Sequence, residues 1–464
     1  MRLRAKRMRN FNIIDLPRIS GLFLILLMFS PILYAQKTDN QIIKDAKILE
    51  SNIEKFVAPY LQMQDFSGAI LISENGKSLF KKGFGFSDYE TRRPNTPQTR
   101  FRIGSLNKQI TAAAILLLEE KGKLKTADTV SKFFPGFPNG DKITIQHLLT
   151  HKAGFPKYIP YKNESKNPTM TELLQIIGSL QPEAKPGERY NYSNAGFVLL
   201  GLITEKISGK TFPQFITDNI FKRLGMKNSG VGLSQQLARG YVTGTGTEIV
   251  SAPSLGVFNY EVFSTVEDLD KWQIGLYGGK LLSPASLTKM TTDYGDKYGY
   301  GLSVGKTSHR YFGHDGITSG YNGFVTYFPD EKLSIVFLGN IESGALGEFQ
   351  TNLPTIAFGK EFRKATVREF AKVVQAENFK NYVGRYEVFP GFYLDVKSER
   401  ETLSLRGPMG AFIALTPLSE NEFFYRHLYA KVIFVKDENQ KIVRLDWKDN
   451  SGSTYPCKKI SSEF

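Results

Sequence analysis

Strand-like segments stand at both ends of a region that otherwise has helical periodicity. Residues 68–86 alternate apolar and polar side chains around Asn75-Gly76, a dipeptide typical of a two-residue hairpin turn. Between 298 and 339, further apolar segments follow one another with short connections, and strands joined in this way run antiparallel. This order predicts an α/β (α+β) domain. Its N- and C-terminal strands share one antiparallel sheet flanked by helices, with a helical region inserted between them.

The segments between these strands carry apolar residues at helical spacing. In the segment 101–124, positions 110, 113, 114, 117 and 118 form an apolar stripe, and Gly122 ends the pattern. The inserted region is therefore predicted to be mainly helical. Further helices are predicted within 40–61, 143–155, 194–209 and 264–279.

The pattern of the chain changes near residues 365–378. A polar helical segment there leads into short alternating segments, with turn residues about every 8–12 positions. That spacing is typical of an all-β domain. We therefore predict a first domain over 36–377 and a C-terminal domain over 378–464, built as a small closed barrel or a sandwich.

Residues 1–35 have the pattern of a secretory signal. The basic segment MRLRAKRMRN precedes an apolar stretch that contains Pro31 and ends at Ala35. This stretch has about 15 residues, fewer than the roughly 20 that a spanning helix needs. We expect cleavage before Gln36, a secreted or periplasmic protein, and no stable membrane insertion afterwards. The alternative is a protein anchored in the membrane by an uncleaved signal.

Composition argues against several other classes of protein. The net charge is +15, but beyond the signal no Lys/Arg-rich run or nucleic-acid-binding motif occurs, so we expect no nucleic-acid partner. Cys457 is the only cysteine, which rules out an internal disulfide. The histidines have no metal-ligand spacing, and we expect neither a metal nor a cofactor. We interpret His147 and His151 as structural, because nothing in the sequence relates them to a reactive group.

A serine followed three residues later by a lysine occurs four times, at Ser78, Ser105, Ser286 and Ser303. Ser78 and Ser303 belong to strand-like segments, where residues three apart point to opposite faces. Ser286 lies in a turn-rich segment before a short helix. Only Ser105 stands at the first turn of a long apolar helix, which places Lys108 one turn away on the same face.

This pair has the residue types of nucleophilic catalysis. A serine hydroxyl attacks a carbonyl once a neighbouring group takes its proton, and a desolvated lysine can be uncharged enough to do so. The helix N-terminus also offers backbone N–H groups to a developing oxyanion. The alternative is structural: Ser105 caps the helix and Lys108 is solvated.

Two later motifs accompany the pair: YSN at 192–194, before an apolar helix, and HDG at 314–316, on a strand. In this order, the three motifs resemble the active-site elements of the penicillin-recognising serine hydrolases. These include class C β-lactamases, D-alanyl-D-alanine carboxypeptidases, D-aminopeptidases and related esterases. The resemblance extends over residues 65–345, and the C-terminal segments resemble the lipocalin-like β-domain appended to such hydrolases. The matching elements are Ser105-x-x-Lys108, Tyr192-x-Asn194 and His314-x-Gly316.

The resemblance implies a role for each matching residue. Ser105 attacks the substrate carbonyl and becomes acylated, while Lys108 and Tyr192 share the transfer of its proton. Among the substrate-binding residues, Asn194 binds the substrate amide and orients the lysine. The backbone N–H groups of Ser105 and Ile317 form the oxyanion hole. His314 lies on the strand that faces the substrate, where it lines the side of the substrate carboxylate and supports Tyr192. Gly316 follows on the same strand.

The sequence also departs from the family pattern. Class C β-lactamases usually carry Lys-Thr-Gly where this chain has His314-Asp315-Gly316, and a permanent cation suits a substrate carboxylate better than an imidazole near its pKa. Asp315 adds a negative charge, which either holds His314 protonated or disfavours anionic substrates. Tyr260 and Glu261 stand where a glycine pair is expected and would narrow the site.

The sequence therefore predicts a secreted serine hydrolase that forms a Ser105 acyl-enzyme with D-amino-acid peptides, of D,D-carboxypeptidase or D-aminopeptidase type. Its expected partner is a small molecule or a peptidoglycan-like peptide, and the oligomeric state stays open. Within the family, the alternatives are a carboxylesterase or a β-lactamase. From a different class, the alternative is a penicillin-binding or peptidoglycan-sensing module without turnover.

Overall fold

The computed structural model describes most of the chain from residue 42 onward. The predicted signal at 1–35 and the residues around the predicted domain boundary at 377 lie outside the described ranges. Within those ranges, no helix combines the length and the apolar character required to cross a membrane. The described residues are 42–157, 159, 168–232, 234, 236–243, 249–251, 261–363, 379–399, 402–407, 412–426, 428–449 and 452–463.

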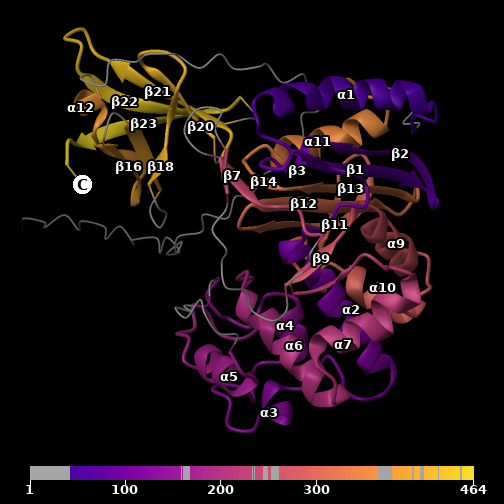
Figure 1. Ribbon diagram of the computed structural model, residues 1–464. Helices are drawn as coiled ribbons and strands as arrows, with labels where there is room; N and C mark the ends of the chain where they lie inside the picture. Colours follow the sequence, from indigo (N-terminus) through magenta and orange to yellow (C-terminus); the bar gives the residue numbers. More distant parts are fainter. Residues whose placement is uncertain are drawn as a thin grey trace, which may run out of the picture. The chain divides into compact units, whose positions relative to one another are not determined.

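A six-stranded antiparallel sheet forms the centre of the N-terminal part of the described chain (Figure 1). Strands from both ends of this region are neighbours, since the sheet order is β10-β11-β12-β13-β1-β2. Ala69 of β1 lies opposite Leu338 of β13, and Asn75-Gly76 connects the β1–β2 hairpin. The predicted shared sheet is therefore confirmed. Its strands are β1 (Gly68–Glu74), β2 (Lys77–Phe84), β10 (Ser303–Lys306), β11 (Arg310–Thr318), β12 (Tyr321–Phe328) and β13 (Leu333–Gly339).

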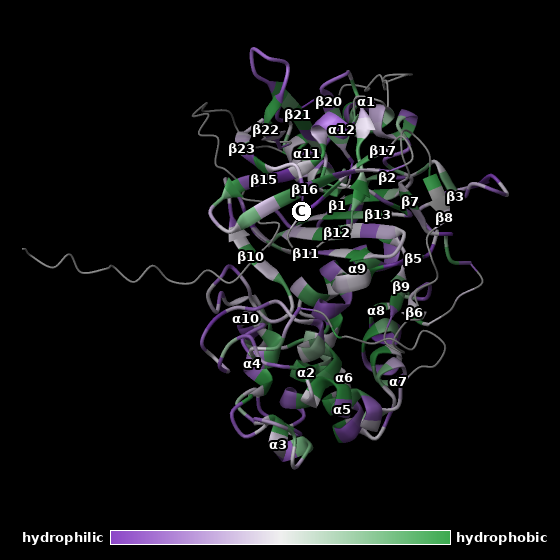
Figure 2. Cartoon of the chain, turned by 90° about the vertical axis from the view of Figure 1, so that its left-hand side faces the viewer, coloured by the Kyte–Doolittle hydropathy of each residue, from purple (hydrophilic) through white to green (hydrophobic). Residues whose placement is uncertain are grey.

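β1 and β13 are buried at almost every position because helices cover both faces of the sheet (Figure 2). Successive side chains of a strand point to opposite faces. Ala69 and Leu71 accordingly enter one core, and Ile70 and Ile72 enter the other. Burying each large aliphatic side chain stabilises the fold by about 1.5–3 kcal/mol. The first core includes α2 (Asn107–Glu120), α6 (Asn194–Ser208) and α9 (Val266–Tyr277), and the second includes α1 (Ala46–Gln62) and α11 (Leu346–Ala357).

The region between β2 and β10 is mainly helical, as predicted. Several of its helices begin at a threonine whose side chain accepts a backbone N–H in the first turn, as Thr144 does for α4 and Thr169 for α5. Its shorter elements are β3 (Phe86–Asp88), β4 (Arg93–Pro94), β5 (Phe101–Arg102), α3 (Val130–Phe133), α4 (Ile145–Leu149), α5 (Met170–Gly178), α7 (Phe212–Ile216), η2 (Thr217–Phe221), α8 (Lys222–Leu224), β6 (Gly230–Val231), β7 (Tyr241–Thr243), β8 (Ile249–Ser251), β9 (Val262–Ser264) and α10 (Pro284–Thr291); β14 (Ile341–Glu342) follows β13.

The C-terminal region is a nearly closed, nine-stranded antiparallel barrel with its own core. Along β21, the buried Val432 and Phe434 alternate with more exposed neighbours, as expected for a strand with one face toward a core. The predicted all-β domain is confirmed, and it is a barrel. Its elements are α12 (Phe379–Tyr382), β15 (Gly384–Phe389), β16 (Phe392–Glu399), β17 (Thr402–Arg406), β18 (Ile413–Ala414), β19 (Thr416–Pro417), β20 (Glu422–Tyr425), β21 (Ala430–Lys436), β22 (Ile442–Lys448) and β23 (Thr454–Ser461).

A buried ion pair joins the turn after β20 to the segment after α1. The guanidinium of Arg426 binds the carboxylate of Asp65 and donates to the carbonyl of Met63 at 2.6 Å. Tyr429 donates to the same carboxylate at 3.2 Å. Asp65 and Arg426 are each 2% exposed. Loss of either partner would leave an uncompensated charge in the interior.

Candidate active site

Ser105 lies on a single 3-10 turn, η1 (Gly104–Leu106), that runs directly into α2. Gly104 has φ +51°, a left-handed conformation that glycine adopts without strain, and this lets the chain turn from β5 into the helix. Every residue of α2 from Lys108 to Leu118 is buried. The polar pair therefore stands at the end of a core helix, where η1 packs against β11.

The structure brings Ser105 together with three of the residues predicted from the sequence. Lys108 Nζ donates to Ser105 Oγ at 2.9 Å, and Tyr192 OH donates to the same oxygen at 2.8 Å. Lys108 Nζ also donates to Asn194 Oδ1 at 2.9 Å. Ser105 thus does not act as a simple helix cap: no helix N–H binds its hydroxyl among the described contacts, whereas an amine and a phenol do.

Lys108 is held in an environment that disfavours its charge. The residue is 6% exposed, and burial lowers its pKa from 10.5 to about 7, although the negative charge of Asp315 opposes this shift. Its amine lies 4.8 Å from the centre of the Tyr192 ring and 5.5 Å from that of Phe197. A substantial fraction of Lys108 is therefore uncharged near neutral pH and able to accept a proton.

Tyr192 and Asn194 are placed by the start of α6. Asn194 is the first residue of the helix, and Ser193 before it has an extended backbone. The Ser193 hydroxyl donates to the carbonyl of Pro156 at 2.7 Å, which ties this segment to the loop after α4. The extended residue turns Tyr192 and Asn194 toward the same serine–lysine pair, although the two belong to a loop and a helix.

The two predicted oxyanion donors belong to segments whose backbones touch. A Cβ added to Gly316 would lie 2.1 Å from the carbonyl oxygen of Ile103, and one added to Gly104 would lie 3.1 Å from the nitrogen of Ile317. Only glycines allow η1 and β11 to approach so closely. The backbone nitrogens of Ser105 and Ile317 therefore stand on adjacent segments at the serine.

His314 is buried, and both of its ring nitrogens contact protein atoms. Nε2 lies 2.9 Å from the hydroxyl of Tyr298, and Nδ1 lies 2.5 Å from the backbone oxygen of Asp315. Burial lowers the pKa of His314, and this outweighs the opposite influence of the Asp315 charge. Of the two effects considered for Asp315, holding His314 protonated is thus the wrong one. The predicted support of Tyr192 is a ring contact, with centroids 6.3 Å apart.

Two residues that sequence reasoning missed complete the site. His151, interpreted from the sequence as structural, packs its ring on that of Tyr192 with centroids 4.2 Å apart. Tyr298 lies between the two histidines, with its hydroxyl 3.3 Å from His151 Nε2. Neither residue has a local sequence signal, because loops far apart in the chain bring them together. His147, by contrast, is structural as expected: its Nδ1 accepts the backbone N–H of Thr144 at the start of α4.

Glu261 lies beside the end of β11. Its carboxylate accepts a hydrogen bond from the Thr318 hydroxyl at 3.0 Å and pairs with Arg102. This places the Glu261 side chain against Thr318, one residue beyond the predicted oxyanion donor Ile317. Tyr260, expected to narrow the site together with Glu261, lies outside the described residues.

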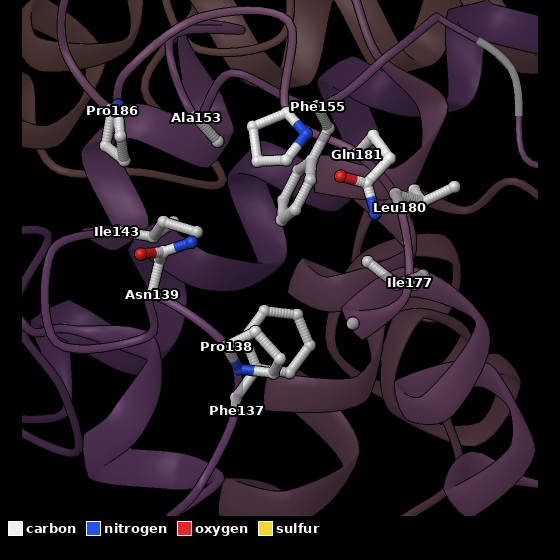
Figure 3. Close-up of a pocket in the computed structure, with 12 residues that line it drawn as sticks. Phe137, Pro138, Asn139, Ile143, Ala153, Phe155, Ile177, Leu180, Gln181 and Pro186 are labelled. Atoms are coloured by element: carbon white, nitrogen blue, oxygen red, sulfur yellow. The ribbon is translucent and has the colours of Figure 1, made fainter.

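A separate pocket lies behind the loop that follows His151 (Figure 3). Its wall includes Ala153 and Phe155 of that loop, together with Phe137, Ile143 and Ile177 from the helical region. None of its lining residues is titratable, and none belongs to the serine cluster. Among the described residues there is also no group of three or more His, Cys, Asp or Glu side chains that could hold a metal ion.

Comparisons with known proteins identify the family of this chain. The family model described as Beta-lactamase matches residues 53–353. A penicillin-binding protein of Bacillus subtilis is 30% identical over 433 residues, which cover 84% of this chain and 94% of that protein.

Solved structures of penicillin-binding proteins and of an amidase superpose on this protein. A penicillin-binding protein from Bacillus halodurans has a TM-score of 0.57 and 28% identity, covering 63% of this chain and 96% of its own. The octameric penicillin-binding protein homologue from Pyrococcus abyssi has a TM-score of 0.59 and 27% identity, covering 89% and 100%. The D-amino acid amidase from Ochrobactrum anthropi, at 23% identity, shares the fold with a TM-score of 0.58 over 67% of this chain and 97% of its own. The chain therefore belongs to the Beta-lactamase family, and it is a serine hydrolase of that family.

Proposed function

We propose that the protein is an exported hydrolase that forms an acyl-enzyme at Ser105 with D-amino-acid peptides, of D,D-carboxypeptidase or D-aminopeptidase type. The observation that carries this proposal is the position of Ser105 Oγ, which receives hydrogen bonds from Tyr192 OH at 2.8 Å and Lys108 Nζ at 2.9 Å. A hydroxyl in contact with a buried amine and a phenol can lose its proton as it attacks a carbonyl.

Acylation and deacylation then use the same groups in opposite directions. In acylation, Ser105 Oγ bonds to the carbonyl carbon while its proton passes to the neutral amine of Lys108, directly or through Tyr192. The bond to the leaving amine or alcohol breaks, and the proton goes to that group. In deacylation, water adds to the acyl carbon and gives a proton to the same amine, and Ser105 Oγ leaves with that proton.

The remaining predicted residues would bind the substrate. Asn194, whose carbonyl oxygen holds the Lys108 amine, would donate from its amide nitrogen to the substrate. The backbone N–H groups of Ser105 and Ile317 would stabilise the oxyanion, since the segments that carry them touch. His314 and Gly316 would form the substrate-side wall on β11.

The charge of Asp315 favours one type of substrate over another. Its side chain is 52% exposed, and its charge acts on Lys108, His314 and Tyr190. Among the described ion pairs, its single neighbour is the His314 ring at 3.9 Å, and burial disfavours the charge on that ring. A free substrate carboxylate would be repelled here, and a free ammonium attracted. Within the proposal, this favours the D-aminopeptidase type over the D,D-carboxypeptidase type, and it disfavours β-lactams.

A carboxylesterase is the second candidate within the family. A neutral ester presents no carboxylate to Asp315, so the same charge that disfavours D,D-carboxypeptidase substrates leaves an ester unaffected. A penicillin-binding or peptidoglycan-sensing module without turnover is the candidate from a different class. Its signature would be stable acylation of Ser105 without release of product.

The test is a substrate panel of D-aminoacyl amides, D-Ala-D-Ala peptides, short-chain p-nitrophenyl esters and nitrocefin. We expect the fastest turnover with D-aminoacyl amides and labelling of the wild type by a fluorophosphonate. Ser105→Ala should abolish both. Ser286→Ala is the matched control, because Ser286 has the same S-x-x-K spacing on α10. Labelling that survives Ser105→Ala would end the proposal, and labelling without turnover of any substrate would favour the sensing module.

Export rests on the sequence of residues 1–35 and is tested separately. Expression of the full chain in a Gram-negative host, followed by N-terminal sequencing of the soluble protein, should give a mature start at or near Gln36. A membrane-bound protein that retains residues 1–35 would instead identify an anchored enzyme.

A further inference from the structure

The first observation is the backbone of His151. This residue is buried, 2% exposed, and has φ +56°, a left-handed conformation that is uncommon for residues other than glycine. Two backbone N–H groups on either side of Tyr192 bind it: that of Asn191 donates to the His151 carbonyl at 2.7 Å, and that of Ser193 donates to His151 Nδ1 at 3.0 Å. His151 thus contacts the Tyr192 ring directly and binds the backbone of the residues before and after it.

The second observation is a hydrogen-bond chain whose direction is determined at both ends. A peptide N–H can only donate and a peptide oxygen can only accept. Since Ser193 N–H donates to His151 Nδ1, the neutral His151 ring carries its proton on Nε2 and donates to Tyr298 OH.

The other end of this hydrogen-bond series is determined independently. The backbone oxygen of Asp315 can only accept, so the neutral His314 ring has its proton on Nδ1, and its Nε2 accepts from the Tyr298 O–H at 2.9 Å. This series of hydrogen bonds therefore runs from the Y-x-N segment to the H-x-G strand, and each of its side chains has a partner on both sides.

The surroundings of this hydrogen-bond series favour the neutral form of the His151 and His314 rings. Burial lowers the pKa of His151 and of His314, and the Lys108 ammonium lowers both further. Asp315 is the acid that opposes this for His314. Tyr298, which links the rings, is fully buried, and the pKa of its hydroxyl is raised well above its usual value, so it stays protonated.

We propose that His151 and Tyr298 are positioning residues of the active site, which hold Tyr192 against Ser105 and lock His314 in its Nδ1-protonated tautomer through one directed chain of hydrogen bonds. The proposal rests on acylation at Ser105. It goes beyond that chemistry by assigning a function to two residues outside the three motifs.

The direct test is spectroscopic and does not depend on activity. Two-bond ¹H–¹⁵N spectra of ¹⁵N-histidine-labelled protein distinguish the two tautomers and the charged ring, and single-histidine variants assign the signals. We expect His151 protonated at Nε2 and His314 at Nδ1, both neutral at pH 6. A His314 ring protonated at Nε2, or a charge on either ring at that pH, would overturn the directed chain.

The kinetic test uses Tyr298→Phe, which keeps the ring and removes only the hydroxyl. We expect the acylation rate per folded molecule to fall by about tenfold to a hundredfold, with KM changed less than kcat, because a small misplacement of a reacting group has an effect of this size. Tyr300→Phe is the matched control: Tyr300 is equally buried, 1% exposed, two residues along the chain and stacked on Tyr294. Equal rates for the two variants would refute the role of Tyr298.

Two substitutions of His151 separate the parts of its function. His151→Asn keeps an acceptor for Ser193 N–H and tolerates a positive φ, but it cannot reach Tyr298. His151→Leu removes both contacts. We expect His151→Asn to retain more acylation activity than His151→Leu, with similar secondary structure by circular dichroism. If both match the wild type while Ser105→Ala is inactive, the positioning role is wrong and the proposed function stands; if Ser105→Ala acylates normally, the proposed function itself fails.

Discussion

Replacing Lys108 by methionine should abolish acylation and make the protein more stable at neutral pH. Lys108 is 6% exposed, and burial lowers its pKa from 10.5 to about 7. One pKa unit corresponds to about 1.36 kcal/mol, so the folded state carries a free-energy cost of about 5 kcal/mol for this lysine at low pH. Methionine has a similar length and no charge, and it removes that cost.

The sign of the pH dependence follows from which state binds the proton. Below pH 7 the lysine is charged in both states, and the full desolvation cost opposes folding. Between pH 7 and 10.5 the unfolded state binds more protons than the folded state, so wild-type stability rises by up to about 1.36 kcal/mol per pH unit. Above 10.5 the lysine is neutral in both states, and the cost is gone.

The lost hydrogen bonds reduce the net gain from the substitution. Lys108 Nζ donates to Ser105 Oγ and Asn194 Oδ1, and each bond contributes about 1 kcal/mol. At pH 7 half of the folded protein already has a neutral lysine, so the cost there is about 4 kcal/mol, and Lys108→Met should stabilise the protein by about 2 kcal/mol. The difference should fall to about −1 kcal/mol at pH 10.

Urea unfolding of both proteins between pH 7 and 10 measures this difference directly. Lys123→Met is the control, because Lys123 is exposed beyond the end of α2 and its substitution should give no pH-dependent difference. Wild-type acylation should rise with pH through about 7, as Lys108 loses its proton. A stability difference that does not change with pH, or a Lys108→Met protein that still acylates, would refute the argument that burial makes this lysine the base.

Three further outcomes are expected. Asp315→Asn should raise kcat/KM for D-Ala-D-Ala peptides relative to neutral esters by about tenfold, since it removes a half-exposed negative charge beside the site; an unchanged ratio at low salt would mean that this charge does not reach the substrate. Gly316→Ala should destabilise the fold by about 1–3 kcal/mol and lower acylation sharply, because its Cβ would lie 2.1 Å from the carbonyl oxygen of Ile103. Gly407→Ala is the control, since its Cβ would meet nothing within 4 Å, and it should show neither effect in thermal unfolding and labelling. Arg426→Met should lower the free energy of unfolding by about 3–5 kcal/mol in a urea titration, because it leaves the buried Asp65 carboxylate without its cationic partner. A loss below about 1 kcal/mol would contradict that view.

The sequence by itself determined the elements whose signals are local. Alternation and the Asn75-Gly76 turn specify the β1–β2 hairpin, and an apolar stripe of period 3.6 specifies α2. Residues three apart lie on one face of a helical turn, so Ser105 and Lys108 could be selected from four S-x-x-K matches as the proposed nucleophile and its amine neighbour. Such signals depend on a few neighbouring residues, so they can be interpreted without knowledge of the tertiary contacts.

The tertiary structure decided what depends on contacts between distant segments. The low pKa of Lys108 arises from burial, and burial is a property of everything that packs around α2. The same holds for the lowered pKa of His314, whose direction the motif left open, and for the position of His151 on Tyr192. These residues are far apart in the sequence, and they affect one another through hydrogen bonds and shared burial in the folded protein. No local period or spacing in the sequence predicts such contacts.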